Sequence, residues 1–356
     1  MRQFLSPEAL AMKPYTPGEQ PRDQQYNKLN TNESPFPPSP RVVEVVSQDQ
    51  VGMLNLYSDP TCKVLEDAIA KFYGVEPENV TSGNGSDEVL AFAFRAFAGG
   101  GKPIAYADIT YGCYKTWAAL FGIESKVIPL GEDFTINVDD YMDFPGTIVL
   151  ANPNAPTGML LPESDIRRLL AADPERVVII DEAYVHFGCE SLVPLTKEYE
   201  NLLVVQTMSK NRNLAGARVG YAMGSAALID GINRVKYSFN PYNVNRLSLI
   251  AGAAALEDEA YFRQCCGAIC ENRAWTTKAL EELGFTVLPS YANFIFAKSD
   301  VLPGGDLYLK LKERGILVRW FDAERIRPFV RITIGSMEQM KQLVETIKAL
   351  LKEVGA

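Results

Sequence analysis

Short apolar runs alternate along the chain with longer segments in which apolar residues recur every three or four positions. The runs are rich in β-branched residues and end at turn-forming residues, which is typical of buried strands. The segments between them have the period of amphipathic helices. Strands are expected at 79–81, 103–107, 125–130, 147–151, 177–180 and 202–206, and helices at 63–72, 86–98, 114–121 and 163–172. This alternation predicts an α/β fold with a mainly parallel central sheet and helices on both faces.

The pattern changes after about residue 255. One long helix is expected at 257–283, followed by strands at 285–288, 294–297, 316–319 and 330–333 and by helices at 306–314 and 337–353. This arrangement predicts a smaller α+β domain. The first 30 residues are Pro-rich and irregular, and we expect them to cross to a neighbouring subunit or to join the small domain. The predicted division is therefore an arm (1–30), a large domain (31–255) and a small domain (256–356).

Composition narrows the class of protein. The 356 residues are 47% hydrophobic and 22% charged, as in soluble globular proteins. A net charge of −9 and a pI of about 5.0 argue against nucleic-acid binding. No apolar run approaches the length of a membrane span, and we expect no signal peptide. Scattered cysteines without a CxxC pair, and a single histidine, predict reduced thiols in a cytoplasmic protein and no metal site.

Lys210 is the first candidate for chemistry. It follows the apolar strand expected at 202–206, Ser209 precedes it, and Arg218 lies eight residues later on a Gly-rich segment. A lysine at the end of a strand can form an imine with an aldehyde, and the hydroxyl and guanidinium beside it can hold a phosphate. Pyridoxal 5′-phosphate (PLP) is an aldehyde that carries a phosphate, and enzymes that use it need such a lysine.

Asp181 follows the buried run 177–180, 29 residues before Lys210. Ligands of α/β proteins bind at the carboxyl ends of strands, where this carboxylate is expected. A carboxylate there can keep the pyridine nitrogen of PLP protonated, so that the ring accepts electrons. Tyr184, three residues later, can donate a hydrogen bond to the ring phenolate oxygen.

Three further segments also follow expected strands. GNGSDE at 83–88 precedes a helix N-terminus and suits a phosphate. It lacks the third glycine of the dinucleotide fingerprint, so nicotinamide binding is disfavoured. Tyr111 can stack on a planar ring or belong to the core, and the stiff NPNAPTG turn at 152–158 faces the same crevice. Together these segments predict a PLP site.

The whole chain resembles the fold-type-I PLP-dependent aminotransferases, in their histidinol-phosphate aminotransferase branch. The resemblance rests on several motifs: KPYTPG (13–18), KLNTNESPF (28–36), LYSDP (56–60), GNGSDE (83–88), TYGCY (110–114), NPNAPTG (152–158), DEAY (181–184), the Lys210 run and VRITIG (330–335). It implies a fold-type-I PLP transferase that transfers the amino group of L-histidinol phosphate to 2-oxoglutarate in histidine biosynthesis. Two alternatives remain open, an aromatic amino-acid aminotransferase and, less favoured, an amino-acid phosphate decarboxylase.

The resemblance also implies roles for individual residues. Lys210 carries the Schiff base and moves the proton, Asp181 pairs with the pyridine nitrogen, and Tyr184 contacts the phenolate oxygen. The remaining cofactor contacts would come from Ser86, the Asp87 backbone, Tyr111, Asn154, Ser209, Arg218 and, from the partner subunit of a homodimer, Tyr57. Substrate would be bound by Tyr15, Asn32, Arg319 and Arg331.

Two positions depart from the family pattern. The family usually has asparagine directly before Pro-Thr-Gly, where this chain has Ala155; Asn154 or Asn152 would have to substitute. Asn211-Arg212-Asn213 replaces the small and aromatic residues that more often follow the lysine, and this extra polarity is expected to bear on substrate preference. A transcription-regulator effector domain is disfavoured, because no basic helix-turn-helix segment precedes residue 30.

Overall fold

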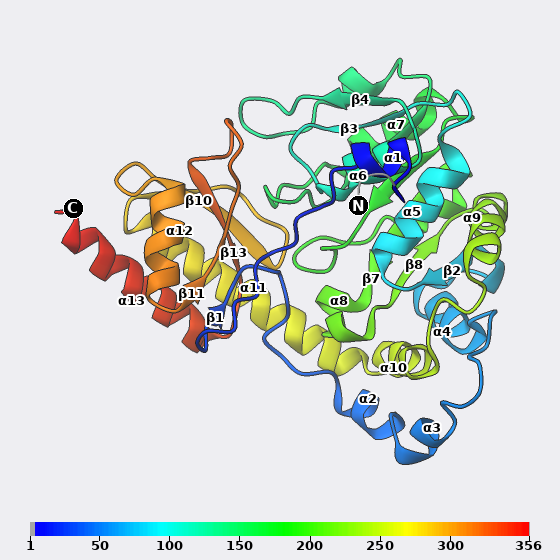
Figure 1. Ribbon diagram of the computed structural model, residues 1–356, viewed down its shortest axis with the longest axis horizontal. Helices are drawn as coiled ribbons and strands as arrows, with labels where there is room; N and C mark the ends of the chain where they lie inside the picture. Colours follow the sequence, from blue (N-terminus) through cyan, green and yellow to red (C-terminus); the bar gives the residue numbers. More distant parts are fainter. Residues whose placement is uncertain (1–3, 356) are drawn as a thin grey trace.

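The central sheet of the larger domain contains seven strands within residues 4–355, which are the residues that the computed structural model describes (Figure 1). The strand order is β2-β8-β7-β6-β5-β3-β4, and every neighbouring pair is parallel except the two that involve β8. The bounds are β2 (Val80–Gly83), β3 (Ile104–Ala107), β4 (Ser125–Ile128), β5 (Thr147–Ala151), β6 (Val178–Asp181), β7 (Leu202–Thr207) and β8 (Gly220–Met223).

Helices cover both faces of this sheet because successive strand residues point to opposite sides. Ile179 and Val205 belong to the apolar cluster under α5 and α9, whereas Ile180 and Val204 belong to the cluster under α4, α7 and α10. The covering helices are α4 (Lys63–Tyr73), α5 (Ser86–Phe97), α6 (Cys113–Leu120), α7 (Glu163–Ala172), α9 (Ala226–Phe239) and α10 (Arg246–Glu257). The mainly parallel α/β sheet predicted from the sequence is therefore confirmed.

Strand β8 was not among the predicted strands. It is short, begins at a glycine and pairs antiparallel with both β2 and β7. A Cβ at Gly220 would lie 2.1 Å from the backbone nitrogen of Ser86, so glycine is required there. This close approach fixes the N-terminus of α5 against the sheet.

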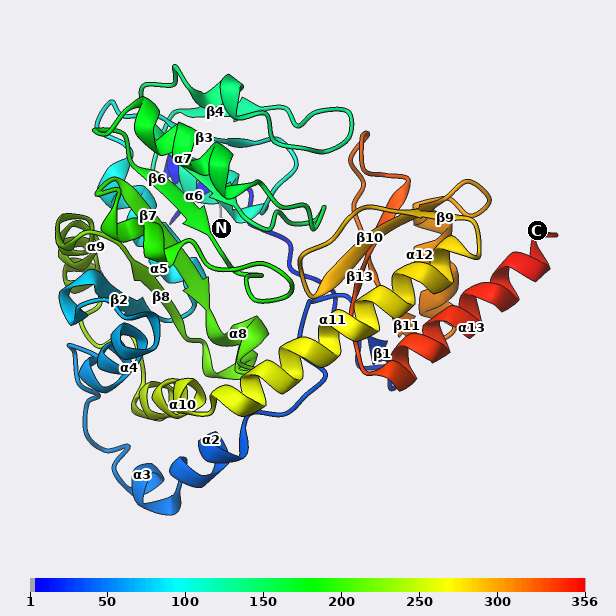
Figure 2. The same cartoon turned by 180° about the vertical axis from the view of Figure 1, so that it is seen from behind.

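The smaller domain contains a four-stranded antiparallel sheet (Figure 2). Its order is β12 (Arg319–Trp320), β13 (Phe329–Thr333), β10 (Phe294–Ser299) and β9 (Phe285–Val287). Three helices pack against it around one apolar cluster: α11 (Glu259–Glu281), α12 (Gly304–Glu313) and α13 (Met337–Glu353). Figures 1 and 2 show α11 running from the large domain, where it follows α10, to the small one.

Two predicted elements differ from the structure. The single helix expected at 257–283 is interrupted at Asp258, which leaves the helical conformation and accepts a hydrogen bond from the backbone of Tyr261 as the N-cap of α11. The strand expected at 316–319 is divided into β11 (Ile316–Leu317) and β12, which belong to different sheets. Local apolar runs do not indicate which sheet each part joins.

The N-terminal arm is attached to the small domain. Strand β1 (Asn27–Lys28) pairs in parallel with β11, and the Leu29 amide donates to the Leu317 carbonyl. Residues 1–3 of the predicted arm lie outside the described residues. The remaining short helices are α1 (Pro7–Ala11), α2 (Pro40–Val45), α3 (Gln48–Gly52) and α8 (Met208–Asn211), with 3-10 turns at Pro77–Asn79, Val138–Tyr141, Val193–Lys197 and Ala215–Ala217.

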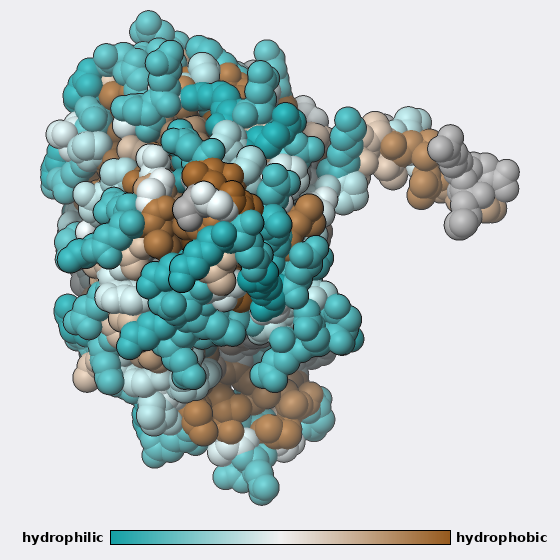
Figure 3. Space-filling model, turned by 90° about the vertical axis from the view of Figure 1, so that its left-hand side faces the viewer, coloured by the Kyte–Doolittle hydropathy of each residue, from teal (hydrophilic) through white to brown (hydrophobic). Residues whose placement is uncertain are grey.

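Two groups of exposed apolar side chains lie at the edges of the view in Figure 3. The start of the arm projects from the body and exposes Phe4, Leu5 and Leu10. The lower end of the molecule, where α2 and α3 lie in Figure 1, exposes a second group: Val43, Val51, Met53, Leu54 and Leu56. In the described part of the chain, no helix has both the length and the apolarity needed to cross a bilayer.

Candidate active site

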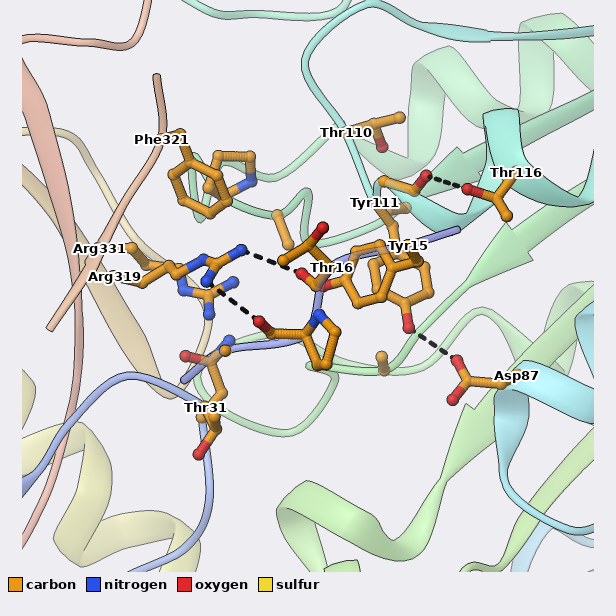
Figure 4. A pocket seen from close by; sticks show the side chains of 18 of the residues that line it. Tyr15, Thr16, Thr31, Asp87, Thr110, Tyr111, Thr116, Arg319, Phe321 and Arg331 are labelled. Atoms are coloured by element: carbon orange, nitrogen blue, oxygen red, sulfur yellow. Dashed lines mark hydrogen bonds between the residues drawn. The ribbon is translucent and has the colours of Figure 1, made fainter. Parts of the chain in front are cut away.

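A cavity of about 1300 Å³ lies at the carboxyl ends of the central strands, between the two domains. Residues of the large domain, the small domain and the arm line it. It includes twelve of the residues proposed from the sequence: Tyr15, Asn32, Ser86, Asp87, Tyr111, Asp181, Tyr184, Ser209, Lys210, Arg218, Arg319 and Arg331. Figure 4 shows the arginines on one wall and Tyr111 with Asp87 on the other, with Tyr15 and Thr16 of the arm between them.

Asp181 is the last residue of β6, and its carboxylate is buried at the floor of the cavity. One oxygen accepts a 2.6 Å hydrogen bond from the Tyr114 hydroxyl, and the other accepts from the Ala183 amide at 3.1 Å. Burial raises the pKa of Asp181 to about 6. No cationic side chain of the described residues pairs with this carboxylate, so it is a buried acceptor for a cation inside the cavity.

Lys210 lies on α8, directly after β7. Its Nζ donates to the backbone carbonyl of Thr31 at 3.1 Å and lies 6.0 Å from the centre of the Tyr184 ring. Burial, and then the positive charge of Arg331, lower the pKa of the Lys210 ammonium to about 8. A lower pKa increases the neutral fraction of the amine, which is the form that attacks a carbonyl or accepts a proton.

The N-terminus of α5 and Arg218 form an anion-binding end of the cavity. The first amides of a helix have no intrahelical partner and carry partial positive charge. Arg218 lies 3.4 Å from Asp87 (Nη2 to Oδ2), and a Cβ at Gly85 would lie 2.5 Å from that same Nη2. Ser209 adds a hydroxyl, which accepts from Thr207 at 2.9 Å. Amides, hydroxyls and a guanidinium form a cradle of the kind that binds a phosphate.

Tyr184 and Tyr111 both line the cavity, and each hydroxyl forms a hydrogen bond. The Tyr184 hydroxyl accepts a 2.9 Å hydrogen bond from the Asn32 side chain, and its ring packs edge-on against Phe294. The Tyr111 hydroxyl donates to Asp87 at 2.8 Å. Burial raises the pKa of both hydroxyls, so they stay protonated at neutral pH and remain hydrogen-bond donors.

Arg319 and Arg331 are paired neighbours on the antiparallel strands β12 and β13, and both guanidinium groups enter the cavity. Arg331 donates to the Asn30 carbonyl at 2.9 Å, and its buried Nε has no hydrogen-bond partner among the described residues. Arg319 donates to the carbonyls of Thr16 (3.2 Å) and Pro17 (3.4 Å) in the arm (Figure 4). Two adjacent guanidinium groups make this wall suitable for a phosphate or carboxylate.

Two of the proposed residues, Asn154 and Tyr57, do not line the cavity. For Asn154 the structure differs from the predicted cofactor contact. Asn154 does not line the cavity, because its amide bonds to the Ile109 carbonyl and to the hydroxyls of Thr110 and Thr157. Asn152 is similarly engaged with the backbone of Leu161, so neither asparagine replaces the family residue.

Ala155 itself lines the cavity and packs beside Phe294. Tyr57, predicted to act in a partner subunit, is 79% exposed and stacks on Tyr242 at 4.5 Å.

The polar run after Lys210 points away from the cavity. The Arg212 guanidinium is buried between the rings of Phe72 and Phe262, 4.6 Å and 3.6 Å from their centres. Asn213 donates to the Pro37 carbonyl. These side chains join α8 to the segments behind it and do not line the cavity. The effect of this run on substrate preference stays a prediction.

The sequence did not identify several residues that the structure brings to the site. Tyr114 is a fully buried aromatic residue on α6 and cannot be distinguished by pattern from core. Thr31 takes part through its backbone carbonyl, which no side-chain motif reveals. Glu33 lines the cavity and forms an ion pair with Lys28 at 2.7 Å. Its place next to Asn32 was the only available signal.

These residues fit PLP. The buried, cation-free Asp181 matches a protonated ring nitrogen, and the cradle of Ser86, Asp87, Ser209 and Arg218 matches the phosphate. Lys210 supplies an amine with a lowered pKa in the same cavity. The glycine at position 85 leaves space for the Arg218 guanidinium that a side chain would take, which is consistent with a built anion site.

The fold and this site define a PLP-dependent transferase of fold type I. The family model "Aminotransferase class I and II" matches residues 24–347, and the chain belongs to this family. It is 50% identical over 354 residues to a histidinol-phosphate aminotransferase of Marinomonas sp. (strain MWYL1), covering 98% of this chain and 100% of the other. It is 48% identical over 353 residues to that of Brachyspira hyodysenteriae, covering 99% and 100%.

Solved structures show the same fold. The histidinol-phosphate aminotransferase of Clostridium acetobutylicum has a TM-score of 0.84 at 23% identity, covering 92% of this chain and 99% of the other. That of Sinorhizobium meliloti, solved in complex with pyridoxal-5′-phosphate, has a TM-score of 0.81 at 23% identity, covering 91% of each chain.

Proposed function

We propose that this protein is a PLP-dependent transaminase that uses L-histidinol phosphate as amino donor and 2-oxoglutarate as acceptor. The observation that carries the proposal is the arrangement of Lys210, Asp181 and the paired arginines around one cavity. An amino donor with a phosphate needs an anion fork beside the reactive lysine, and Arg319 and Arg331 provide it. Relatives of nearly equal length carry the name histidinol-phosphate aminotransferase, which supports this donor.

When bound, PLP supplies an aldehyde that condenses with amines and a ring that accepts the electron pair left at the donor Cα. Asp181 then holds the proton on the ring nitrogen, and its buried position strengthens this charge pair. Arg331 and Arg319 hold the anionic group and thereby orient the donor. Lys210 moves the Cα proton, because its lowered pKa makes the neutral amine accessible near neutral pH.

The test is a half-reaction panel with the PLP-loaded enzyme. L-Histidinol phosphate, phenylalanine and threonine phosphate are each added, and conversion of the cofactor to its amino form is followed by absorbance. Preference for histidinol phosphate supports the proposal, whereas preference for phenylalanine supports the aromatic aminotransferase. Release of carbon dioxide without a keto acid indicates the decarboxylase. Lys210→Ala is expected to abolish the visible band of the lysine-bound cofactor and turnover; turnover at the wild-type rate would refute the role of Lys210.

We further propose that the enzyme is a cytoplasmic homodimer with shared active sites. The six cysteines are free thiols, which supports a reducing compartment. The exposed apolar residues near α2 and α3, and the exposed Tyr57 that follows them, support a subunit interface there. Mixing inactive Lys210→Ala with Tyr57→Ala is expected to restore activity, because a hybrid dimer has one site with both residues. No restoration after refolding the mixture would argue against shared sites.

A further inference from the structure

The segment 321–328, between β12 and β13, forms part of the wall of the cavity. Phe321, Asp322 and Ile326 of this segment line the cavity. The segment is held in shape by its own bonds: Arg327 pairs with Asp322 at 2.7 Å, and Trp320 donates to the Arg327 carbonyl at 2.8 Å. We call it the 321–328 wall. It begins two residues after Arg319, the arginine of β12 that enters the cavity.

Arg325 joins this wall to the large domain. Its guanidinium donates to the Asp108 carboxylate at 3.0 Å and to the carbonyls of Leu130 at 3.0 Å and Gly131 at 2.6 Å. The other oxygen of Asp108 accepts from the backbone amides of Ile109 and Leu130. One arginine of the small domain thus binds three acceptors on two loops that follow β3 and β4.

An apolar cluster continues the same contact. Phe329 of the small domain packs edge-on against Phe134 of the large domain, with ring centres 5.5 Å apart. Ile326 and Leu130 belong to the same buried cluster. The Arg325 guanidinium also lies 5.5 Å from the centre of the Phe134 ring. The contact between the domains therefore has an apolar interior and a hydrogen-bonded arginine at its edge.

The residues that form this contact lie close in sequence to residues on the two facing walls of the cavity. Asp108 lies three residues before Tyr111, and Arg325 lies six residues after Arg319. In Figure 4, Tyr111 faces Arg319, Phe321 and Arg331 across the arm. We propose that Arg325 is a positioning residue that sets the separation between the anion-binding arginines and the Tyr111 wall. The identity of the anion rests on the proposed function; the positioning itself does not.

The positioning role of Arg325 depends on the hydrogen-bond geometry of its guanidinium rather than on its charge. The side chains of Arg325 and Asp108 are 36% and 28% exposed, so Coulomb attraction between them is screened. The two carbonyl acceptors require the planar fork of arginine, which the single ammonium of lysine does not reproduce. We therefore expect Arg325→Lys to behave like Arg325→Ala, whereas a role in charge alone would be restored by lysine.

The kinetic experiment compares Arg325→Ala and Arg325→Lys with Arg327→Ala in the PLP-loaded enzyme. Arg327 is a matched control, because it lies in the same wall, pairs within it, and does not line the cavity. For L-histidinol phosphate we expect KM to rise roughly 10-fold in both Arg325 variants, with kcat changed by less than about 3-fold. L-Histidinol, which lacks the phosphate, should show a smaller change. Equal effects of the Arg325 and Arg327 substitutions would overturn the proposal.

Hydrogen exchange measured by mass spectrometry provides a readout that does not depend on the donor. Arg325→Ala should speed exchange in 128–136 as well as in 321–328, because the Leu130 and Gly131 carbonyls lose their guanidinium donor. Asp108, which accepts from the Leu130 amide, also loses its bond to Arg325. Arg327→Ala should affect 321–328 alone. Unchanged exchange in 128–136 would refute the proposal even if the proposed donor is correct, and faster exchange would support it even if the donor is wrong. Asp108→Ala serves if Arg325→Ala does not fold, and it should also speed exchange in 128–136, because the Leu130 amide loses its carboxylate acceptor.

Discussion

The Tyr114 hydroxyl donates a 2.6 Å hydrogen bond to Asp181, the buried carboxylate at the end of β6 that lines the cavity. This bond favours the charged carboxylate, whereas burial disfavours it and raises its pKa to about 6. The two effects oppose each other, so the tyrosine limits how far burial can neutralise the acid. Removing the Tyr114 hydroxyl should therefore change the pKa of Asp181 in a predictable direction.

Tyr114→Phe is expected to raise the pKa of Asp181 further. Asp181 becomes protonated as pH falls through its pKa, and a neutral acid no longer forms an ion pair with the ring nitrogen. Cofactor affinity should therefore decline below about pH 6 in the wild type and at a higher pH in the variant. Cofactor titrations of the ligand-free protein at several pH values measure this shift. Tyr141→Phe is the control, because that hydroxyl is buried without a partner among the described residues; equal shifts in both variants would contradict the prediction.

Lys210→Met is expected to stabilise the ligand-free protein at pH 7. The pKa of Lys210 is about 8 in the folded protein, below its usual value of 10.5, so the unfolded chain binds more protons between these values. Stability therefore rises with pH across this window, and the ammonium destabilises the fold below it. Methionine removes this cost, on the order of 1–3 kcal/mol at pH 7.

Urea unfolding at pH 7 and above pH 10 measures this difference. The gain in stability of Lys210→Met over the wild type should shrink at the higher pH, where Lys210 of the wild type is neutral in both the folded and the unfolded state. Lys115→Met, at an exposed position on the same cavity, should leave stability at pH 7 unchanged, because this side chain is not buried on folding. A variant that is less stable than the wild type at pH 7 would disprove the predicted cost of Lys210.

Gly85→Ala is expected to weaken cofactor binding. The new Cβ would lie 2.5 Å from Arg218 Nη2, and glycine at this position has φ = 88°, where alanine is strained. The arginine must move away from the phosphate cradle, so the dissociation constant for PLP should rise roughly 10-fold. Activity should recover at high PLP concentration. Gly267→Ala, with open space around its Cβ, should leave the affinity unchanged; similar losses in both would indicate general destabilisation.

Arg331→Ala should impair donor binding more than Arg319→Ala. Arg331 is held deeper in the site and has an unpartnered Nε, whereas Arg319 already donates to two arm carbonyls. We expect the donor KM to rise roughly 10- to 100-fold for Arg331→Ala and several-fold less for Arg319→Ala. Steady-state kinetics with the anionic donor measure the order. The reverse order would show that Arg319 is the principal anion ligand.

The sequence predicted the parts of the site that depend on the ends of buried strands. Asp181 and Lys210 follow continuous apolar runs, and in a parallel sheet the ends of such runs meet at one edge. The same logic failed for Asn154, which follows β5 but turns its amide into the loop. A strand end places a backbone near the crevice; local hydrogen bonds decide which side chains face it.

Contacts between distant loops were not accessible from the sequence. Arg325 meets Asp108 across 217 residues, and neither stands in a periodic segment or a motif. Tyr114 resembles any core aromatic residue until Asp181 is placed beside it. Strand β8 is short and begins at a glycine, so its pattern gives no strand signal. Each of these features arises from tertiary packing, which local patterns do not encode.

The pairing of β1 with β11 determines when the site can be completed during protein synthesis. Leu29 bonds to Leu317 and Thr333, and the residues that follow it, Thr31 and Asn32, contact Lys210 and Tyr184. The segment that supplies these contacts is among the first to leave the ribosome, yet its partner strands are among the last. A nascent chain released before residue 333 lacks the partners that hold this segment in place. The contacts that hold Thr31 and Asn32 in the active site therefore cannot form until residues 316–333 have been synthesised.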